Sequence, residues 1–179
     1  MIAFINASPL IYLGKLGLLE HLPKLYNTII TNSVVKNELL ADSSAPEHTA
    51  LQIAFSSWLT LKDPEDAVLL GRLEQLNIHA GEAGVIALAQ ESKSQNILII
   101  DDLNARDISR TLGIRVMGTL GMLLEFLKEE LITSEEAKQK LKLLVDTTTF
   151  RISTKLYSNV LEKLEAYKNM DGHLGHSQR

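Results

Sequence analysis

The chain has 179 residues, of which 45% are hydrophobic, and its formal net charge is −4. This length predicts one full-sized domain with an appended tail, and the lack of cysteine excludes disulfides, thiolate zinc sites and iron–sulfur clusters. The negative charge argues against a strongly basic nucleic-acid coat, so any nucleic acid would be met by a local patch.

The apolar run at the N-terminus predicts no membrane span. It is interrupted at Asn6, Ser8 and Pro9, lacks a basic leader, and reaches Lys15 well short of the roughly 20 apolar residues that a spanning helix needs. We therefore expect a cytoplasmic protein that makes no membrane contact.

Short apolar segments alternate with longer stretches of helical period along the first two thirds of the chain. This alternation is typical of an α/β fold with a mostly parallel central sheet. Each segment is nearly all apolar, as expected for strands that helices cover on both faces. The predicted strands are Ile2–Asn6, Thr28–Thr31, Ile97–Ile100 and Ile114–Met117.

Cap residues mark the expected helix starts in this part of the chain. Ser8 is a natural N-cap, and Pro9 suits the first helical position. Asn32 and Ser33 are expected to cap the next helix. The predicted helices after the first are Val34–Leu40, Pro64–Leu76, Glu82–Ala89 and Ala105–Leu112.

The C-terminal third is predicted to be helical scaffold, with Thr133 or Ser134 as the cap of its second helix. Its predicted elements are helices Leu120–Leu131, Ser134–Leu144 and Leu156–Tyr167, the last amphipathic, and a short extended piece Phe150–Ile152. The expected organisation is one domain over residues 1–131, a C-terminal helical extension packed on it over residues 132–168, and a flexible tail over residues 169–179.

Acidic side chains gather at the predicted strand ends and helix starts. Asp101 and Asp102 directly follow a buried strand, and ligands of open parallel sheets bind beyond the carboxyl ends of strands. The alternative is that Asp102 is an N-cap and Asp101 a solvated turn residue. Glu82 equally suits the helix dipole of a first turn, and Glu38 equally suits a helix surface. None of these acids identifies a site alone.

Taken in order, these segments resemble the PIN-domain family, which includes VapC-type ribonuclease toxins, and in particular a poorly characterised prokaryotic branch of it. The likeness covers about residues 1–168. The matching stretches are Asn6-Ala7-Ser8-Pro9-Leu10-Ile11, Leu16–Leu19, Leu22–Leu25, Val35–Glu38, Gly81-Glu82, Asp101–Arg106, Gly118–Gly121 and Phe150–Ser153 with Leu156-Tyr157.

The resemblance implies a three-layer α/β/α fold and a Mg²⁺- or Mn²⁺-dependent endoribonuclease. Hard divalent ions prefer oxygen ligands, and they polarise a phosphate and activate water. On this interpretation the catalytic and metal-binding acids are Glu38, Glu82, Asp101 and Asp102. Ser8, Arg106 and Arg110 would contact the RNA, although surface ion pairs explain the two arginines equally well.

The chain departs from the family pattern at its first acid, because Asn6 stands where the family has aspartate. A carboxamide oxygen can still ligate a metal, but it brings no negative charge and cannot act as a base. We therefore expect weakened metal affinity. Either residual nuclease activity remains, or the domain binds RNA or a protein partner without cutting.

The resemblance also suggests partners. Similar PIN proteins are toxins neutralised by an antitoxin protein, and PIN domains commonly form homodimers, for which the apolar face of Leu156–Leu164 is a candidate. A receiver-like signalling domain is a third hypothesis. It ranks below the others because receiver domains place their acid pair after the first strand, and Asp101 and Asp102 follow a late one.

Overall fold

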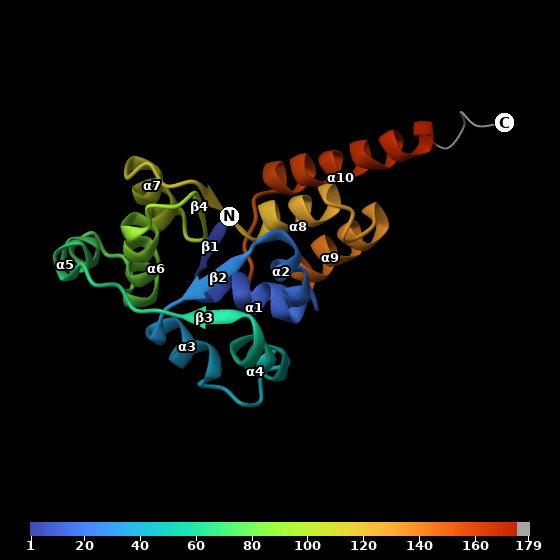
Figure 1. Ribbon diagram of the computed structural model, residues 1–179. Coiled ribbons are helices and arrows are strands. Elements are labelled where there is room, and N and C mark those ends of the chain that lie inside the picture. Colours follow the sequence, from blue (N-terminus) through green and yellow to red (C-terminus); the bar gives the residue numbers. More distant parts are fainter. Residues whose placement is uncertain (175–179) are drawn as a thin grey trace. The chain divides into compact units, whose positions relative to one another are not determined.

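The computed structural model describes residues 1–174. These residues contain one sheet of five strands in the order β3-β2-β1-β4-β5 (Figure 1). Every neighbouring pair is parallel. The direction of winding reverses between β1 and β4, and ligands of open α/β sheets bind at such a switch point. The strands are β1 (Ile2–Ile5), β2 (Thr28–Thr31), β3 (Leu59–Leu61), β4 (Asn96–Ile99) and β5 (Val116–Met117).

Helices cover both faces of this sheet, which gives the three-layer α/β/α fold that the sequence predicts. The chain moves from β1 to β3 in one direction and from β3 back to β5 in the other, so right-handed crossovers place the two groups of helices on opposite faces. Figure 1 shows α5, α6 and α7 together on one side. The helices up to β5 are α1 (Ala7–Lys15), the 3₁₀ helix η1 (Leu19–His21), α2 (Leu22–Leu25), α3 (Ser33–Leu40), α4 (His48–Ser57), α5 (Ala67–Gln75), α6 (Ala80–Glu91) and α7 (Leu103–Thr111).

Helix α6 packs on the two central strands. It contacts both β1 and β4, and its small residues let its backbone approach them closely. Phe4, Ile5, Leu98 and Ile99 of these strands are fully or almost fully buried. This packing brings the first turn of α6 to the carboxyl edge of the sheet, beside the switch point.

The structure confirms the four strands that the sequence predicts, Thr28–Thr31 with the predicted bounds and the other three with ends shifted by one or two residues. It adds β3, which the sequence analysis missed because the strand has three residues and buries only Leu59. It also adds α4, where no strong cap residue announces a helix. Residues Phe150–Ile152 belong to no helix or strand, so the predicted extended piece there stays a prediction.

The first helix starts earlier than predicted. Asn6, not Ser8, occupies the N-cap position, and its side chain makes no capping hydrogen bond. The chain turns directly from β1 into α1, which places Ser8 and Pro9 inside the first turn. Helix α5, by contrast, starts later than predicted, at Ala67 rather than at Pro64, because Asp66 accepts a hydrogen bond from the backbone N–H of Leu69 and so supplies the cap.

A second unit follows the sheet. The chain divides into two compact units, Met1–Thr119 and Leu120–Arg179. The sequence instead predicts the boundary at residue 131. The packing of the C-terminal extension on the first unit stays a prediction. The helices from this division onward are α8 (Thr119–Lys128), α9 (Ser134–Thr147) and α10 (Thr154–Leu174). Thr133 caps α9 in a full capping box with Glu136, which confirms one of the two predicted caps.

Helices α9 and α10 contact each other within this unit. The Ser134 hydroxyl donates a 2.7 Å hydrogen bond to the carbonyl of Leu164, and Val160 and Leu164 are buried. Leu156, which the sequence places on the same face, is exposed. Helix α10 continues through Leu174, past residue 169, where the predicted flexible tail begins. Residues 175–179 of that tail lie outside the described part, and its flexibility stays a prediction.

None of the helices in the described residues combines the length and the apolar character that crossing a membrane requires.

Candidate functional site

The side chain of Asn6 faces Glu82 at the carboxyl end of β1. Asn6 is 4% exposed and has extended backbone angles where the strand ends. Its Nδ2 donates a long hydrogen bond of 3.5 Å to Oε1 of Glu82. The side chain caps no helix and instead contacts the acid.

Glu82 lies in the first turn of α6, three residues after the N-cap His79. Its carboxylate accepts a hydrogen bond from the backbone N–H of His79, as in one half of a capping box. Burial raises the pKa of Glu82, and the carboxylates of Asp102 and Glu38 raise it further, against the opposing hydrogen bond and charge of His79. Three acids from separate elements therefore act on one another at this edge of the sheet.

Gly81 lies close to the side chains of both Asn6 and Glu38. A Cβ atom on Gly81 would lie 3.8 Å from Oδ1 of Asn6, 3.8 Å from Oε2 of Glu38 and 3.2 Å from the Val35 side chain. Glu38 is an exposed residue of α3, so its carboxylate reaches this point from the neighbouring helix. The amide of Asn6 and the acid of Glu38 thus converge on the start of α6.

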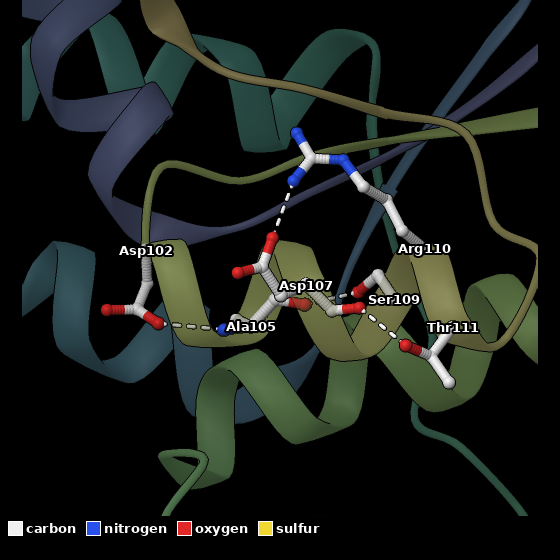
Figure 2. Close-up of polar contacts among 6 residues, drawn as sticks. All are labelled: Asp102, Ala105, Asp107, Ser109, Arg110 and Thr111. Carbon is white, nitrogen blue, oxygen red and sulfur yellow. Dashed lines mark hydrogen bonds and ion pairs between the residues drawn. The ribbon is translucent and has the colours of Figure 1, made fainter.

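Asp102 is the N-cap of α7, the structural alternative that the sequence leaves open for this residue. Figure 2 shows its carboxylate beside the backbone N–H of Ala105, which donates a 2.8 Å hydrogen bond to Oδ1. Asp102 is exposed, and its charge acts on Glu82. The structure therefore brings together Asn6, Glu38, Glu82 and Asp102, which we call the acidic cluster.

Asp101 is directed elsewhere. Its Oδ1 accepts a 2.7 Å hydrogen bond from the backbone N–H of Thr119, and its Oδ2 accepts a 2.6 Å hydrogen bond from the Thr119 hydroxyl. Burial raises the pKa of Asp101, while these two bonds and the charge of Arg106 lower it. A Cβ atom on Gly118 would lie only 2.8 Å from Oδ1 of Asp101, so a larger residue there would displace the Asp101 carboxylate. Asp101 thus fastens the residues that begin α8.

The predicted substrate-binding residues lie on α1 and α7. Ser8 is half-buried in the first turn of α1. Arg106 is half-buried beside Asp101, and its buried Nε finds no hydrogen-bond partner in the part of the chain that the structure describes. Arg110 makes an exposed ion pair with Asp107, with NH1 and Oδ1 2.7 Å apart (Figure 2).

Two buried polar residues at this edge, Asn32 and Thr119, are not among the predicted site residues. Both are almost fully buried, and each directly follows or nearly follows a strand. The sequence pattern that could have identified them also applies to Asn6 and Asp101. In each case a polar residue follows a buried apolar strand at the same edge of the sheet.

The acidic cluster fits a hard divalent cation by its chemistry. Its donors are carboxylate and carboxamide oxygens, the ligands that Mg²⁺ and Mn²⁺ prefer. Among the described side chains, no three His, Cys, Asp or Glu residues already lie close enough to hold a metal ion. Glu38 and Asp102 are exposed, however, and a cation would relieve the crowding of negative charge around Glu82.

The fold and the cluster define a class: a doubly wound α/β protein with an acidic group at its switch point. A family model described as a PIN domain matches residues 2–166, so the chain belongs to the PIN-domain family. Members of this family are generally nucleases and typically use divalent metal ions. Neither a curated protein nor a solved structure matches the chain. The family match confirms the PIN resemblance, while the particular prokaryotic branch stays a prediction.

Proposed function

We propose that this PIN domain is a Mg²⁺- or Mn²⁺-dependent endoribonuclease that is weakened by Asn6. The observation that carries the proposal is the contact of Asn6 with Glu82, whose pKa is raised by burial and also by the nearby charges of Asp102 and Glu38. Separate elements deliver these groups to one edge of the sheet. A site of this kind is suited to a divalent ion and, through it, to a phosphodiester.

In the proposal, Glu38, Glu82 and Asp102 hold the ion, and Asn6 contributes a neutral oxygen. When bound, a divalent ion supplies positive charge to the phosphate and activates water. The chain's own contribution is to orient the oxygens. The half-buried environment of Glu82 strengthens electrostatic interactions relative to those in bulk water.

In this proposal Asp101 holds Thr119 in place and is not a ligand of the ion. The sequence, in contrast, does not distinguish Asp101 from Asp102 as metal ligands. Both oxygens of Asp101 already accept hydrogen bonds from Thr119. Ser8, Arg106 and Arg110 remain the proposed RNA contacts. Of these, Arg110 would have to exchange Asp107 for a phosphate oxygen.

The alternative is a PIN-like protein that binds RNA or a protein partner without cleavage. The neutral side chain of Asn6 favours it, because the amide already satisfies an oxygen of Glu82 through a hydrogen bond and adds no charge for a cation. The roles of a cytoplasmic toxin, an antitoxin partner and a homodimer are proposed from the family resemblance. For a dimer, the exposed Leu156 of α10 offers apolar contact surface.

RNA cleavage by the wild type and by Asn6→Asp, each with millimolar Mn²⁺, tests the proposed function. We expect Asn6→Asp to cleave diverse RNAs at least about 10-fold faster, because it restores a charged ligand. Asn6→Asp/Glu82→Gln is the matched control, and its loss of cleavage would exclude a contaminating nuclease. If the wild type and Asn6→Asp are both inert while a filter assay shows RNA retention, the binding alternative replaces the nuclease.

A further inference from the structure

The side chain of Asn32 joins the start of α3 to the start of α6. Asn32 is 1% exposed and follows β2 directly. Its Oδ1 accepts a 2.8 Å hydrogen bond from the backbone N–H of Val35, which caps α3. Its Nδ2 donates a second 2.8 Å hydrogen bond to the carbonyl of Gly81 in α6. One buried carboxamide therefore satisfies backbone groups of two helices.

Helix α6 is shaped to receive this side chain. A Cβ atom on Gly84 would lie 2.3 Å from Nδ2 of Asn32 and 3.0 Å from its Cγ, and the first of these separations is closer than non-bonded atoms can approach. Glycine lowers helix stability by roughly 1 kcal/mol relative to alanine. The contact with Asn32 gives a packing reason for Gly84 in the middle of the helix.

The two helices joined in this way each carry one acid of the cluster. Helix α3 carries Glu38, and α6 carries Glu82, the residue after Gly81. The two helices contact each other directly. Any shift of the first turn of α6 away from α3 would therefore change the separation of these acids and the contact of Glu82 with Asn6.

We infer that Asn32 is a positioning residue for the acidic cluster: by holding Gly81 against the start of α3, it places Glu82 beside Asn6 and Glu38. The expected effect of Asn32 on metal binding rests on the proposed function. The expected effect of Asn32 on the first turn of α6 rests only on its two hydrogen bonds and its contact with Gly84.

Asn32→Ser is the primary test, because serine keeps a cap acceptor for Val35 and loses the donor to Gly81. We expect amide hydrogen exchange in the first turn of α6 to become faster. We also expect Mn²⁺ affinity, measured by calorimetry, to fall about 10- to 100-fold, as is typical when a partner of a metal ligand is lost.

Asn96→Ser is the matched control at the other end of the same helix. Nδ2 of Asn96 donates 3.1 Å and 3.2 Å hydrogen bonds to the carbonyls of Ala89 and Ser94. Its loss should speed exchange in the last turn of α6 and leave Mn²⁺ affinity unchanged. An equal loss of affinity in both variants would show a general softening of α6 and would overturn the inference.

A double substitution tests the contact with Gly84. Gly84→Ala should lower Tm and Mn²⁺ affinity in the wild type, because the new methyl group collides with Asn32. In the Asn32→Ser background the Nδ2 atom that would lie 2.3 Å from the new methyl group is absent, and alanine favours the helix, so the same change should lower Tm less than it does in the wild type. Additive losses would contradict the inference.

These readouts separate the two proposals. A wild type that binds no Mn²⁺ would sink the proposed metal site, and the exchange rates and the double substitution would then decide the role of Asn32 by themselves. A wild type that binds Mn²⁺, with unchanged affinity in Asn32→Ser, would overturn the role of Asn32 and leave the metal site standing.

Discussion

Asn6 and Glu82 show how one neutral residue changes an acidic site. The amide of Asn6 donates to Glu82, whereas an aspartate at position 6 would face Glu82 as a second negative charge. Even so, burial and the charges of Asp102 and Glu38 hold the pKa of Glu82 above its ordinary value. The folded state thus carries an electrostatic cost at this residue that a bound cation would offset.

This cost predicts a pH-dependent effect of Glu82→Gln. The pKa of Glu82 is raised by folding above its ordinary value of 4.5, so the folded state binds the proton more tightly than the unfolded state. The free energy of unfolding therefore falls as the pH rises from about 4.5 through the raised pKa. Without divalent ions, Glu82→Gln should melt above the wild type at pH 7, and this advantage should fade towards pH 4.

Thermal melts of both proteins in a chelating buffer check this prediction. Asp101, whose pKa burial also raises, contributes a pH dependence of the same sign to both proteins and cancels in their difference. Glutamine keeps an oxygen that can accept the hydrogen bond from His79. A variant less stable than the wild type at pH 7 would show that the negative charge of Glu82 stabilises the fold, contrary to our account.

At this scale the sequence located the residues but could not assign them. Asp101 and Asp102 are adjacent and chemically identical, so no pattern separates them. Their roles differ because Thr119, 18 residues away, donates to Asp101, and Glu82 lies near Asp102. Likewise, Ser8 was predicted as a cap from residue type, although the chain turns into α1 two residues earlier.

Among the elements, α8 depends at its start on a side chain that follows β4. The backbone N–H and hydroxyl of Thr119 both donate to Asp101, and Thr119 is fully buried. The chain thus ties the end of one strand to the residue that begins a helix. Unpaired buried donors are costly, so this tie should contribute measurably to stability.

Asp101→Ala should lower the free energy of unfolding by about 1–3 kcal/mol, the usual cost of leaving a buried donor unsatisfied. Asp107→Ala is the matched control, because it breaks an exposed ion pair with Arg110, for which about 0–1 kcal/mol is expected. Urea denaturation measures both. Equal losses would contradict the structural role of Asp101.

Sequence patterns predicted elements well where a local signal exists. Asn32, Asp102 and Thr133 all accept capping hydrogen bonds at the helix starts where they were expected. β3 and α4 were missed because their signals are weak: the strand is short and half-exposed, and Glu47 before α4 makes no side-chain cap. Their positions are set by packing against β2 and α1.

For the whole molecule, the family match spans residues 2–166 and continues across the division at Thr119, so both units belong to the PIN-domain chain. The alternation of strands and helices predicted the α/β class. It did not predict the strand order, because pairing between distant segments leaves no local signal. That order places β1 beside β4 and so brings Asn6 and Asp102 to one edge.

The central claim is that the acidic cluster binds a divalent ion through Asp102 and not through Asp101. A calorimetric Mn²⁺ titration of the wild type, Asp102→Asn and Asp101→Asn tests it most directly. Asparagine can still cap α7 at position 102 and accept from Thr119 at position 101. We predict that Asp102→Asn loses affinity at least about 10-fold and that Asp101→Asn binds like the wild type. Loss in Asp101→Asn with retention in Asp102→Asn would contradict the account.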